Sequence, residues 1–189
     1  MPTCPEKTDE ELVALTLENQ DYYWHIMKRY EEKLKRYIVR VSGASPEDTE
    51  DLLQDIFIKI YRNLNNFDLD LKFSSWIYRI AHNQVVSNFR KNKNYSTRSL
   101  DDEKIFTKLA HDLDLEQEVD LKYAKNNIMN ILNNLEEKYR EVLVLKFLEE
   151  KNYKEISDIL KKPLGTIASL INRSKENFKK EAALQQVKF

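Results

Sequence analysis

Residues 71–83 read LKFSSWIYRIAHN and give the clearest indication of how this chain folds. The apolar side chains of this stretch recur at the spacing of one face of an amphipathic helix, namely Phe73, Trp76, Ile77, Ile80 and Ala81. The opposite face carries Ser75, Arg79 and His82, with Asn83 at its edge. A basic run without intervening acids follows, formed by Arg90, Lys91, Lys93 and Arg98. The pattern fits a helix that stacks bases and neutralises phosphates of separated DNA strands, and it fits equally a core helix with a solvated end.

The composition of the 189 residues indicates an all-α protein with one or two domains. Two glycines and four prolines are few, and the abundant Leu, Ile, Lys, Glu and Asn suit helices better than sheets. A hydrophobic content of 41% supports packed cores, while no apolar run reaches the length of a membrane span. The single Cys4 excludes an internal disulfide. Because no secretory signal is recognisable, we expect a cytoplasmic protein without membrane insertion.

The formal net charge of −1 does not by itself indicate a nucleic-acid-binding protein. The charges are unevenly distributed, however. Acidic side chains gather in residues 6–21 and 101–120, and basic side chains gather in residues 28–40, 90–98 and 161–180. Such segregation gives different surfaces of one near-neutral chain different potentials, so nucleic-acid binding stays open.

Residues 8–92 are predicted to form a first helical domain. Its four helices are expected at about 8–18, 22–41, 46–64 and 73–92. Thr8 and Glu11 make a capping-box signature at the start of the first helix. Ser45 and Pro46, followed by acids, mark the start of the third helix.

Residues 93–120 are polar and acidic without sustained apolar periodicity, and we interpret them as a flexible linker with one helical turn near 105–109. A second helical domain follows over residues 121–184. Its helices are expected at about 123–135, 139–147, 153–160 and 166–184. The expected architecture is therefore two helical domains joined by a linker.

The second domain ends in a helix-turn-helix pattern, in which a short helix, the turn 161–165 and a longer helix with a basic tail follow one another. In this motif the second helix lies in the major groove and its early residues reach the bases. The buried face of that helix is predicted to be Ile167, Leu170 or Ile171, and Phe178. The exposed face is predicted to be Thr166, Ser169, Asn172, Arg173 and residues 175–180. Arginine can pair with guanine and asparagine with adenine; an ordinary helical hairpin is the alternative.

Two other segments each allow two interpretations. The helix over 46–64 carries an acidic face that would repel phosphate, and such a face is either only solvated or binds another protein. The loop over 65–71 is either a connector with Phe67 turned inward or a pocket for one extruded base, whose edge asparagine side chains would read.

No catalytic or metal-binding cluster is recognisable. The three histidines, His25, His82 and His111, lie in different segments, and neither a glycine-rich phosphate loop nor a metal-ligand spacing occurs. We therefore expect a protein that is not an enzyme and that has no catalytic residues, metal or cofactor.

Three ordered motifs resemble those of bacterial sigma factors. They are DTEDLLQDIF at 48–57, FSSWIYRIAHN at 73–83, and YKEIS at 153–157 with PLGTI at 163–167. The short two-domain form is similar to the extracytoplasmic-function (ECF) class, which is group 4 of the sigma-70 family. The resemblance implies that residues 8–92 are sigma region 2, that residues 121–184 are sigma region 4, and that the linker replaces the middle domains of larger sigma factors.

The resemblance also implies sites and partners. Region 2 of that family binds the clamp helices of the RNA polymerase β′ subunit, which by position involves Asp51, Gln54 and Asp55 here. Region 2 captures and melts the −10 promoter element, which by position involves Asn66, Phe67, Asp68, Lys72, Arg79 and Asn83. Region 4 meets the β flap and reads the −35 element, which by position involves Thr166, Ser169, Asn172, Arg173 and Lys175. The implied partners are core RNA polymerase, promoter DNA and an anti-sigma factor, and the free chain is expected to be a monomer.

The chain departs from the family pattern in two places. The family commonly has an Arg-Gly pair after the loop phenylalanine, where this chain has Asp68 and Leu69. Positions 168 and 170 are often basic in the family, whereas they are Ala168 and Leu170 here. The base preferences at both promoter elements therefore stay open.

The sequence also allows two functions other than promoter recognition as a subunit of polymerase. A stand-alone helix-turn-helix regulator would bind its operator without polymerase. A helical protein–protein adaptor would show no promoter dependence and no response to substitution of Asn172 or Arg173.

Overall fold

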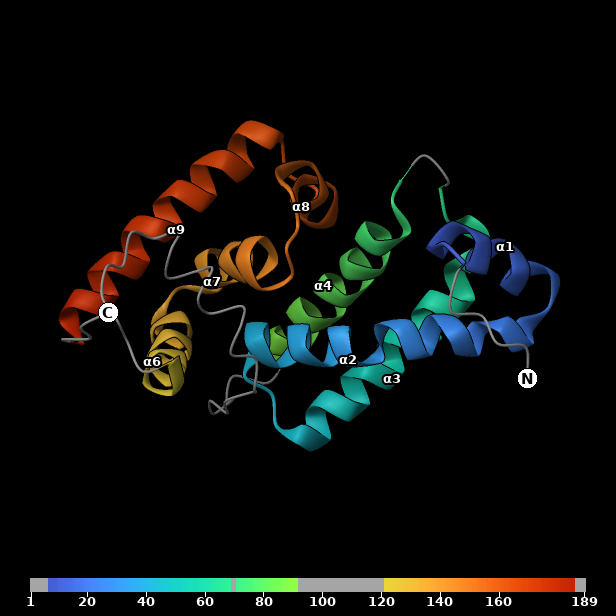
Figure 1. Cartoon of the computed structure of the whole chain (residues 1–189), viewed down its shortest axis with the longest axis horizontal. Helices are drawn as coiled ribbons and strands as arrows, with labels where there is room; N and C mark the ends of the chain where they lie inside the picture. The colour runs from blue at the N-terminus through green and yellow to red at the C-terminus, as the bar shows by residue number, and fades with distance from the viewer. Residues whose placement is uncertain (1–6, 69–70, 92–120, 186–189) are drawn as a thin grey trace.

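The computed structural model describes residues 7–68, 71–91 and 121–185, and every regular element in these ranges is helical (Figure 1). The elements in chain order are α1 (Asp9–Glu18), η1 (Gln20–Tyr22), α2 (Tyr23–Ser42), α3 (Pro46–Asn63), η2 (Leu64–Asn66), α4 (Phe73–Lys91), α6 (Leu121–Asn134), α7 (Glu137–Leu143), η3 (Val144–Leu148), α8 (Tyr153–Leu160) and α9 (Leu164–Leu184). The all-α prediction is confirmed. The predicted linker, with its turn near 105–109, and Cys4 lie outside the described residues.

Helices α1 to α4 form the N-terminal domain, and the expected helix ends are present. The Thr8 side chain accepts a hydrogen bond from the Glu11 amide, and the Glu11 carboxylate accepts one from the Thr8 amide, so the capping box is complete. Gly43 ends α2 in the left-handed region with φ 67°. Ser45 caps α3 by accepting a hydrogen bond from the Asp48 amide at 3.1 Å.

Three aromatic rings join the loop after α3 to the first turn of α4. Phe73 and Trp76 stack with 5.6 Å between ring centroids, and Phe67 packs edge-on to Phe73 at 5.1 Å. All three side chains are buried. Phe67 is turned inward, and the rings of α4 pack in the core.

Helices α6 to α9 form the C-terminal domain, and its middle differs from the expected single helix over 139–147. The α-helical turns end at Leu143, and a π-helical segment, η3, continues to Leu148. Four of the five η3 side chains are buried. Since a π turn holds more residues than an α turn, it lets consecutive apolar side chains point inward, which α-helical periodicity does not predict. Helix α9 starts at Leu164, two residues before the expected start.

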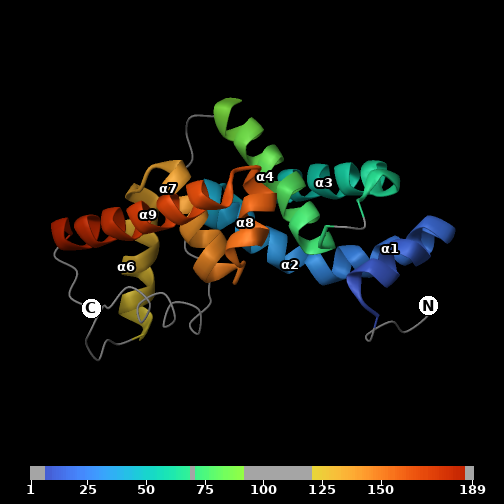
Figure 2. The same ribbon diagram turned by 90° about the horizontal axis from the view of Figure 1, so that it is seen from above.

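The two domains pack against each other, and α8 contacts α4 (Figures 1 and 2). The face of α4 that bears Ser75, Arg79 and His82 lies under α7 and α8. Ser75 is only 1% exposed, and the other two side chains are hydrogen-bonded to the C-terminal domain. The sequence pattern of α4 alone did not indicate this cover, because the hydrogen-bond partners of Arg79 and His82 lie some sixty to eighty positions later in the chain.

Candidate nucleic-acid interface

Helix α9 presents one polar face and buries the other. Ile167, Ile171 and Phe178 are fully buried, as predicted, and Leu170 is partly buried. The predicted outward side chains Thr166, Ser169, Asn172 and Arg173 are exposed. Lys175 is half-buried, with its ammonium 5.3 Å from the centroid of the Phe147 ring. The predicted −35 set therefore lies along one helix, and only its last member also packs on the domain.

The turn before α9 is held by local contacts. Lys161 ends α8 in the left-handed region at φ 50°, and the Ser157 hydroxyl donates to the Lys162 carbonyl oxygen at 2.6 Å. At the other end of α8, Asn152 and Glu155 form a reciprocal capping box. These contacts set the direction of α9 relative to α8. The first turn of α9 is exposed, and a Cβ added to Gly165 would meet nothing within 4 Å.

The acidic face of α3 borders an apolar groove between α2 and α3. Asp51, Gln54 and Asp55 are exposed, and Asp55 accepts a hydrogen bond from the Gln84 amide at 2.8 Å. The groove has a volume of about 810 Å³, and its apolar walls include Tyr23, Met27, Leu53, Phe57 and Ile58. Protein-binding surfaces often combine an apolar centre with a polar rim, which is the arrangement here.

Sequence reasoning missed the apolar residues of this groove, among them Ile58. Ile58 is 48% exposed although it is a large apolar side chain. It lies three and four residues after Asp55 and Gln54, so it shares their helix face. An isoleucine among acids on a predicted outward face was the signal that could have identified it.

The residues predicted for the −10 element fall into three groups. Asn66, Asp68 and Asn83 are exposed. Phe67 is buried among other rings, as described above. The two cations meet α8: the Arg79 Nε donates to the Asp158 carbonyl oxygen at 2.7 Å, and the Lys72 ammonium lies 3.2 Å from the Glu155 carboxylate.

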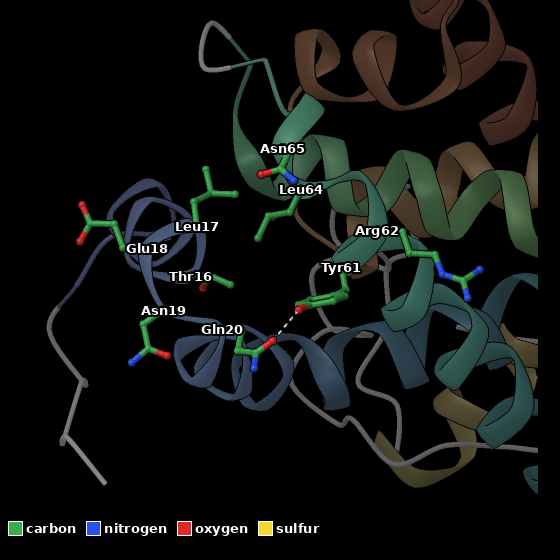
Figure 3. A pocket seen from close by; sticks show the side chains of 9 residues that line it. All are labelled: Thr16, Leu17, Glu18, Asn19, Gln20, Tyr61, Arg62, Leu64 and Asn65. Carbon is green, nitrogen blue, oxygen red and sulfur yellow. Dashed lines mark hydrogen bonds between the residues drawn. The ribbon is translucent and has the colours of Figure 1, made fainter.

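A polar pocket of about 660 Å³ lies beside this loop, between the end of α1, η1 and the end of α3 (Figure 3). It is lined by Thr16, Leu17, Glu18, Asn19, Gln20, Tyr61, Arg62, Leu64 and Asn65. The Tyr61 hydroxyl donates to the Gln20 side-chain oxygen at 3.0 Å across the pocket. Asn65, and not the predicted Asn66, is the loop asparagine that lines it.

Within the part of the chain that the structure describes, no group of three or more His, Cys, Asp or Glu side chains is placed to hold a metal ion. None of the described helices is long and apolar enough to cross a membrane.

Comparisons with known proteins agree with this architecture. Residues 26–95 match the family described as Sigma-70 region 2, and residues 125–178 match Sigma-70, region 4. The chain is 32% identical over 170 residues to the ECF RNA polymerase sigma factor SigW of Bacillus subtilis, covering 86% of this chain and 90% of SigW. It is 28% identical over 183 residues to the ECF RNA polymerase sigma-E factor of Haemophilus influenzae, covering 89% and 92%.

Two solved structures share the fold. CnrH, in complex with the cytosolic domain of CnrY, superposes with a TM-score of 0.69 at 22% identity, covering 96% of this chain and 99% of CnrH. The sigma factor RpoE of Bartonella quintana, in complex with the anti-sigma factor NepR, superposes with a TM-score of 0.63 at 18% identity, covering 85% and 96%. The chain belongs to the ECF class of the sigma-70 family, which makes it a transcription initiation factor that binds RNA polymerase.

Proposed function

We propose that this sigma factor directs RNA polymerase to promoters through two DNA contacts, one in each domain. The C-terminal domain reads the −35 element, and the N-terminal domain captures the −10 element and stabilises the open strands. The observation that best supports this proposal is the row of exposed polar side chains along α9, formed by Thr166, Ser169, Asn172 and Arg173. They occupy the early turns of the second helix of a helix-turn-helix, where base contacts are made.

The chemistry of that row suits a major groove. Arg173 offers the paired donors that guanine accepts, and Asn172 offers the donor and acceptor that match adenine. Thr166 and Ser169 provide hydroxyls near the helix start for bases or phosphates. Lys175, further along, is proposed as a phosphate contact; it is half-buried, with its ammonium 5.3 Å from the centroid of the Phe147 ring. The −35 sequence is thus read mainly by two adjacent side chains.

Polymerase docks on the groove between α2 and α3, and the proposed contact is with the β′ clamp helices. Gln54 and Ile58 line this groove, with Ile58 as an apolar anchor, and the exposed Asp51 and Asp55 lie beside it on α3. An exposed aliphatic side chain loses water contact when a partner helix covers it, and the acids select a basic partner. The C-terminal domain meets the β flap.

The −10 contact uses the loop after α3 together with α4. Asn66 and Asp68 read an extruded base, Phe67 supports the loop from below, and Lys72, Arg79 and Asn83 follow the non-template strand. The polar pocket that Asn65 lines is the hollow next to this loop and can take a flipped base. Each flipped base costs a few kcal/mol of stacking, which these contacts offset only when polymerase holds the DNA in place.

Nucleotide chemistry belongs to the polymerase, so this chain acts without catalytic residues, metal or cofactor of its own. It works in the cytoplasm, where it meets polymerase and chromosome, and it is a monomer when free. An anti-sigma factor that covers polymerase-binding surfaces is the proposed regulator. The complex of RpoE with NepR supports this idea by likeness of fold alone.

Run-off transcription with core polymerase, with and without this chain, over a promoter library tests the proposal. We expect transcripts that depend on the chain and share two promoter elements. Permanganate footprinting should detect strand opening with chain and polymerase together and not with the free chain. A triple variant, Asp51→Ala with Gln54→Ala and Asp55→Ala, should lose polymerase binding while it still folds. Chain-independent transcription, or strand opening by the free chain, would refute the proposal.

A further inference from the structure

Asp9, in the first turn of α1, connects this helix to α2 through both oxygens of its carboxylate. The Tyr30 hydroxyl donates to Asp9 Oδ2 at 2.5 Å, and Arg29 Nη1 donates to Asp9 Oδ1 at 2.8 Å. Tyr30 is only 2% exposed. Burial, together with the hydrogen bond to Asp9, raises the pKa of the Tyr30 hydroxyl, so this group keeps its proton and stays a donor. A hydrogen bond to a charged acceptor is stronger than a neutral one, and α1 therefore fixes the hydroxyl end of the Tyr30 ring.

The Tyr30 ring continues this contact towards the loop after α3. It packs edge-on to Phe73, at 85° and with 6.1 Å between ring centroids, and Phe73 in turn packs on Phe67 at 5.1 Å. All three side chains are buried. We call Tyr30, Phe73 and Phe67 the aromatic relay. It joins the Asp9 carboxylate to the loop through side chains that are in contact one after another.

Helix α1 also meets the loop and the first turn of α4 without the aromatic relay. In the first turn of α1, the Glu10 carboxylate accepts a hydrogen bond at 3.5 Å from the amide of Phe73, which is the first residue of α4. In its last turns, Thr16 and Leu17 line the polar pocket together with Asn65 (Figure 3). The two ends of α1 therefore contact the two segments that flank the loop.

The packing of these groups means that the position of one affects the next. A buried hydroxyl that loses its acceptor is costly, so the Tyr30 ring would shift to find another partner. Rings in a close-packed core cannot move singly, because no empty space receives them. In the sequence, Phe67 lies between Asn66 and Asp68, the two exposed side chains proposed to read an extruded base. Since base reading requires polar groups held within a fraction of an ångström, a shift of Phe67 would weaken it.

We propose that Asp9 is a positioning residue for −10 recognition, which acts through the aromatic relay to hold Asn66 and Asp68 against the extruded base. This inference rests on the proposed role of the loop in reading the −10 element. It goes further by giving α1 a part in promoter selectivity, while Asp9 itself is assigned no contact with DNA or polymerase.

The test uses core polymerase with the full chain on a promoter library that is randomised at both elements, and the run-off transcripts are sequenced. Asp9→Ala and Tyr30→Phe break the same hydrogen bond, the second by removing a single oxygen. Arg29→Gln is the matched control, because it removes the ion pair to the other Asp9 oxygen and leaves the Tyr30 hydrogen bond in place.

We expect Asp9→Ala and Tyr30→Phe each to reduce the ratio of preferred to other bases at the −10 position that the loop reads by about fivefold, the usual effect of one hydrogen bond. The −35 preference in the same library should not change, and Arg29→Gln should match wild type at both elements. Asp9→Asn keeps an acceptor for the Tyr30 hydroxyl and should restore most of the −10 preference.

A loss of −10 preference that is no larger in the double variant, Asp9→Ala with Tyr30→Phe, supports action through their shared hydrogen bond. Fewer transcripts from all sequences alike would show that Asp9 only stabilises the fold, and an unchanged −10 preference in Tyr30→Phe, or an equal loss in Arg29→Gln, would show that the aromatic relay does not act; each result overturns the inference. Circular dichroism confirms that each variant keeps its helices. Wild type without any −10 preference would overturn the proposed −10 role and the inference with it, whereas failure of the inference alone leaves the wild-type preference intact.

Discussion

Replacing Gly165 by alanine separates the requirements of the fold from those of DNA binding. Gly165 lies in the exposed first turn of α9, and an added Cβ would meet no atom within 4 Å. Its φ is not positive, unlike that of Gly43, which is 67°. Neither backbone geometry nor packing therefore explains a glycine at this position of a helix.

The expected gain in stability follows from helix propensity. Glycine inside a helix costs about 0.5–1 kcal/mol relative to alanine because its unfolded backbone has more freedom. For a chain of this length the gain corresponds to a rise in the unfolding temperature of about 1–4 °C. Urea denaturation followed by circular dichroism should show a higher midpoint with an unchanged slope. Gly43→Ala is the matched control and should lose about 1 kcal/mol or more, because alanine is strained at positive φ.

The same substitution should lower transcription although it raises stability. If the first turn of α9 lies against DNA, as proposed, the new methyl group occupies space that the sugar-phosphate backbone needs. Run-off transcription from promoters that depend on the −35 element should therefore fall about fivefold or more, which corresponds to roughly 1 kcal/mol of binding. A destabilised Gly165→Ala protein would refute the structural argument, and a stabilised protein with unchanged transcription would refute the close approach of DNA.

Three further predictions concern other surfaces. Arg173→Ala should weaken promoter binding by about 1–3 kcal/mol and relax the preference at one −35 position in a binding-site selection, whereas equal loss on all sequences would make Arg173 a phosphate contact. Ile58→Ala should weaken polymerase binding about fivefold in titration calorimetry, because the exposed half of the side chain contributes roughly 1 kcal/mol when polymerase buries it. Leu184→Ala, an equally apolar but more exposed control on α9, should leave the affinity unchanged. Burial raises the pKa of the Glu149 carboxyl above 4.5, although Arg40 opposes the shift, so the folded chain takes up a proton at a higher pH than the unfolded chain. The free energy of unfolding of wild type relative to Glu149→Gln should thus increase as the pH falls towards 4.5 and decrease as it rises, and the reverse trend in urea titrations would show that the ion pair with Arg40 dominates.

Local signals in the sequence predicted local structure well. The capping residues Thr8 and Ser45 determine where helices start through contacts within three residues, so a pattern over a few positions is sufficient. The inward and outward faces of α9 were likewise predicted because helical periodicity alone sorts Ile167 and Ile171 from Asn172. In both cases the physical cause is contained in the segment itself.

Contacts between distant segments could not be predicted in this way. Ser75 is buried only because α7 and α8 cover α4, and the hydrogen bond from Arg79 goes to a backbone oxygen, which no residue type encodes. The exposure of Ile58 depends on how α2 and α3 diverge to leave a groove. The π-helical segment 144–148 depends on how its buried side chains pack against the surrounding helices. The roles of the predicted polymerase and DNA residues stay predictions until the experiments above are done.

The ring packing of Phe67, Phe73 and Trp76 gives the protein a natural optical probe. The chain has two tryptophans, of which Trp76 is buried against Phe67 while Trp24 is 43% exposed. With Trp24→Phe, all indole emission would come from the site where the loop is anchored. A red shift of that emission would then report, in real time and without an added dye, any event that pulls Phe67 away from the indole.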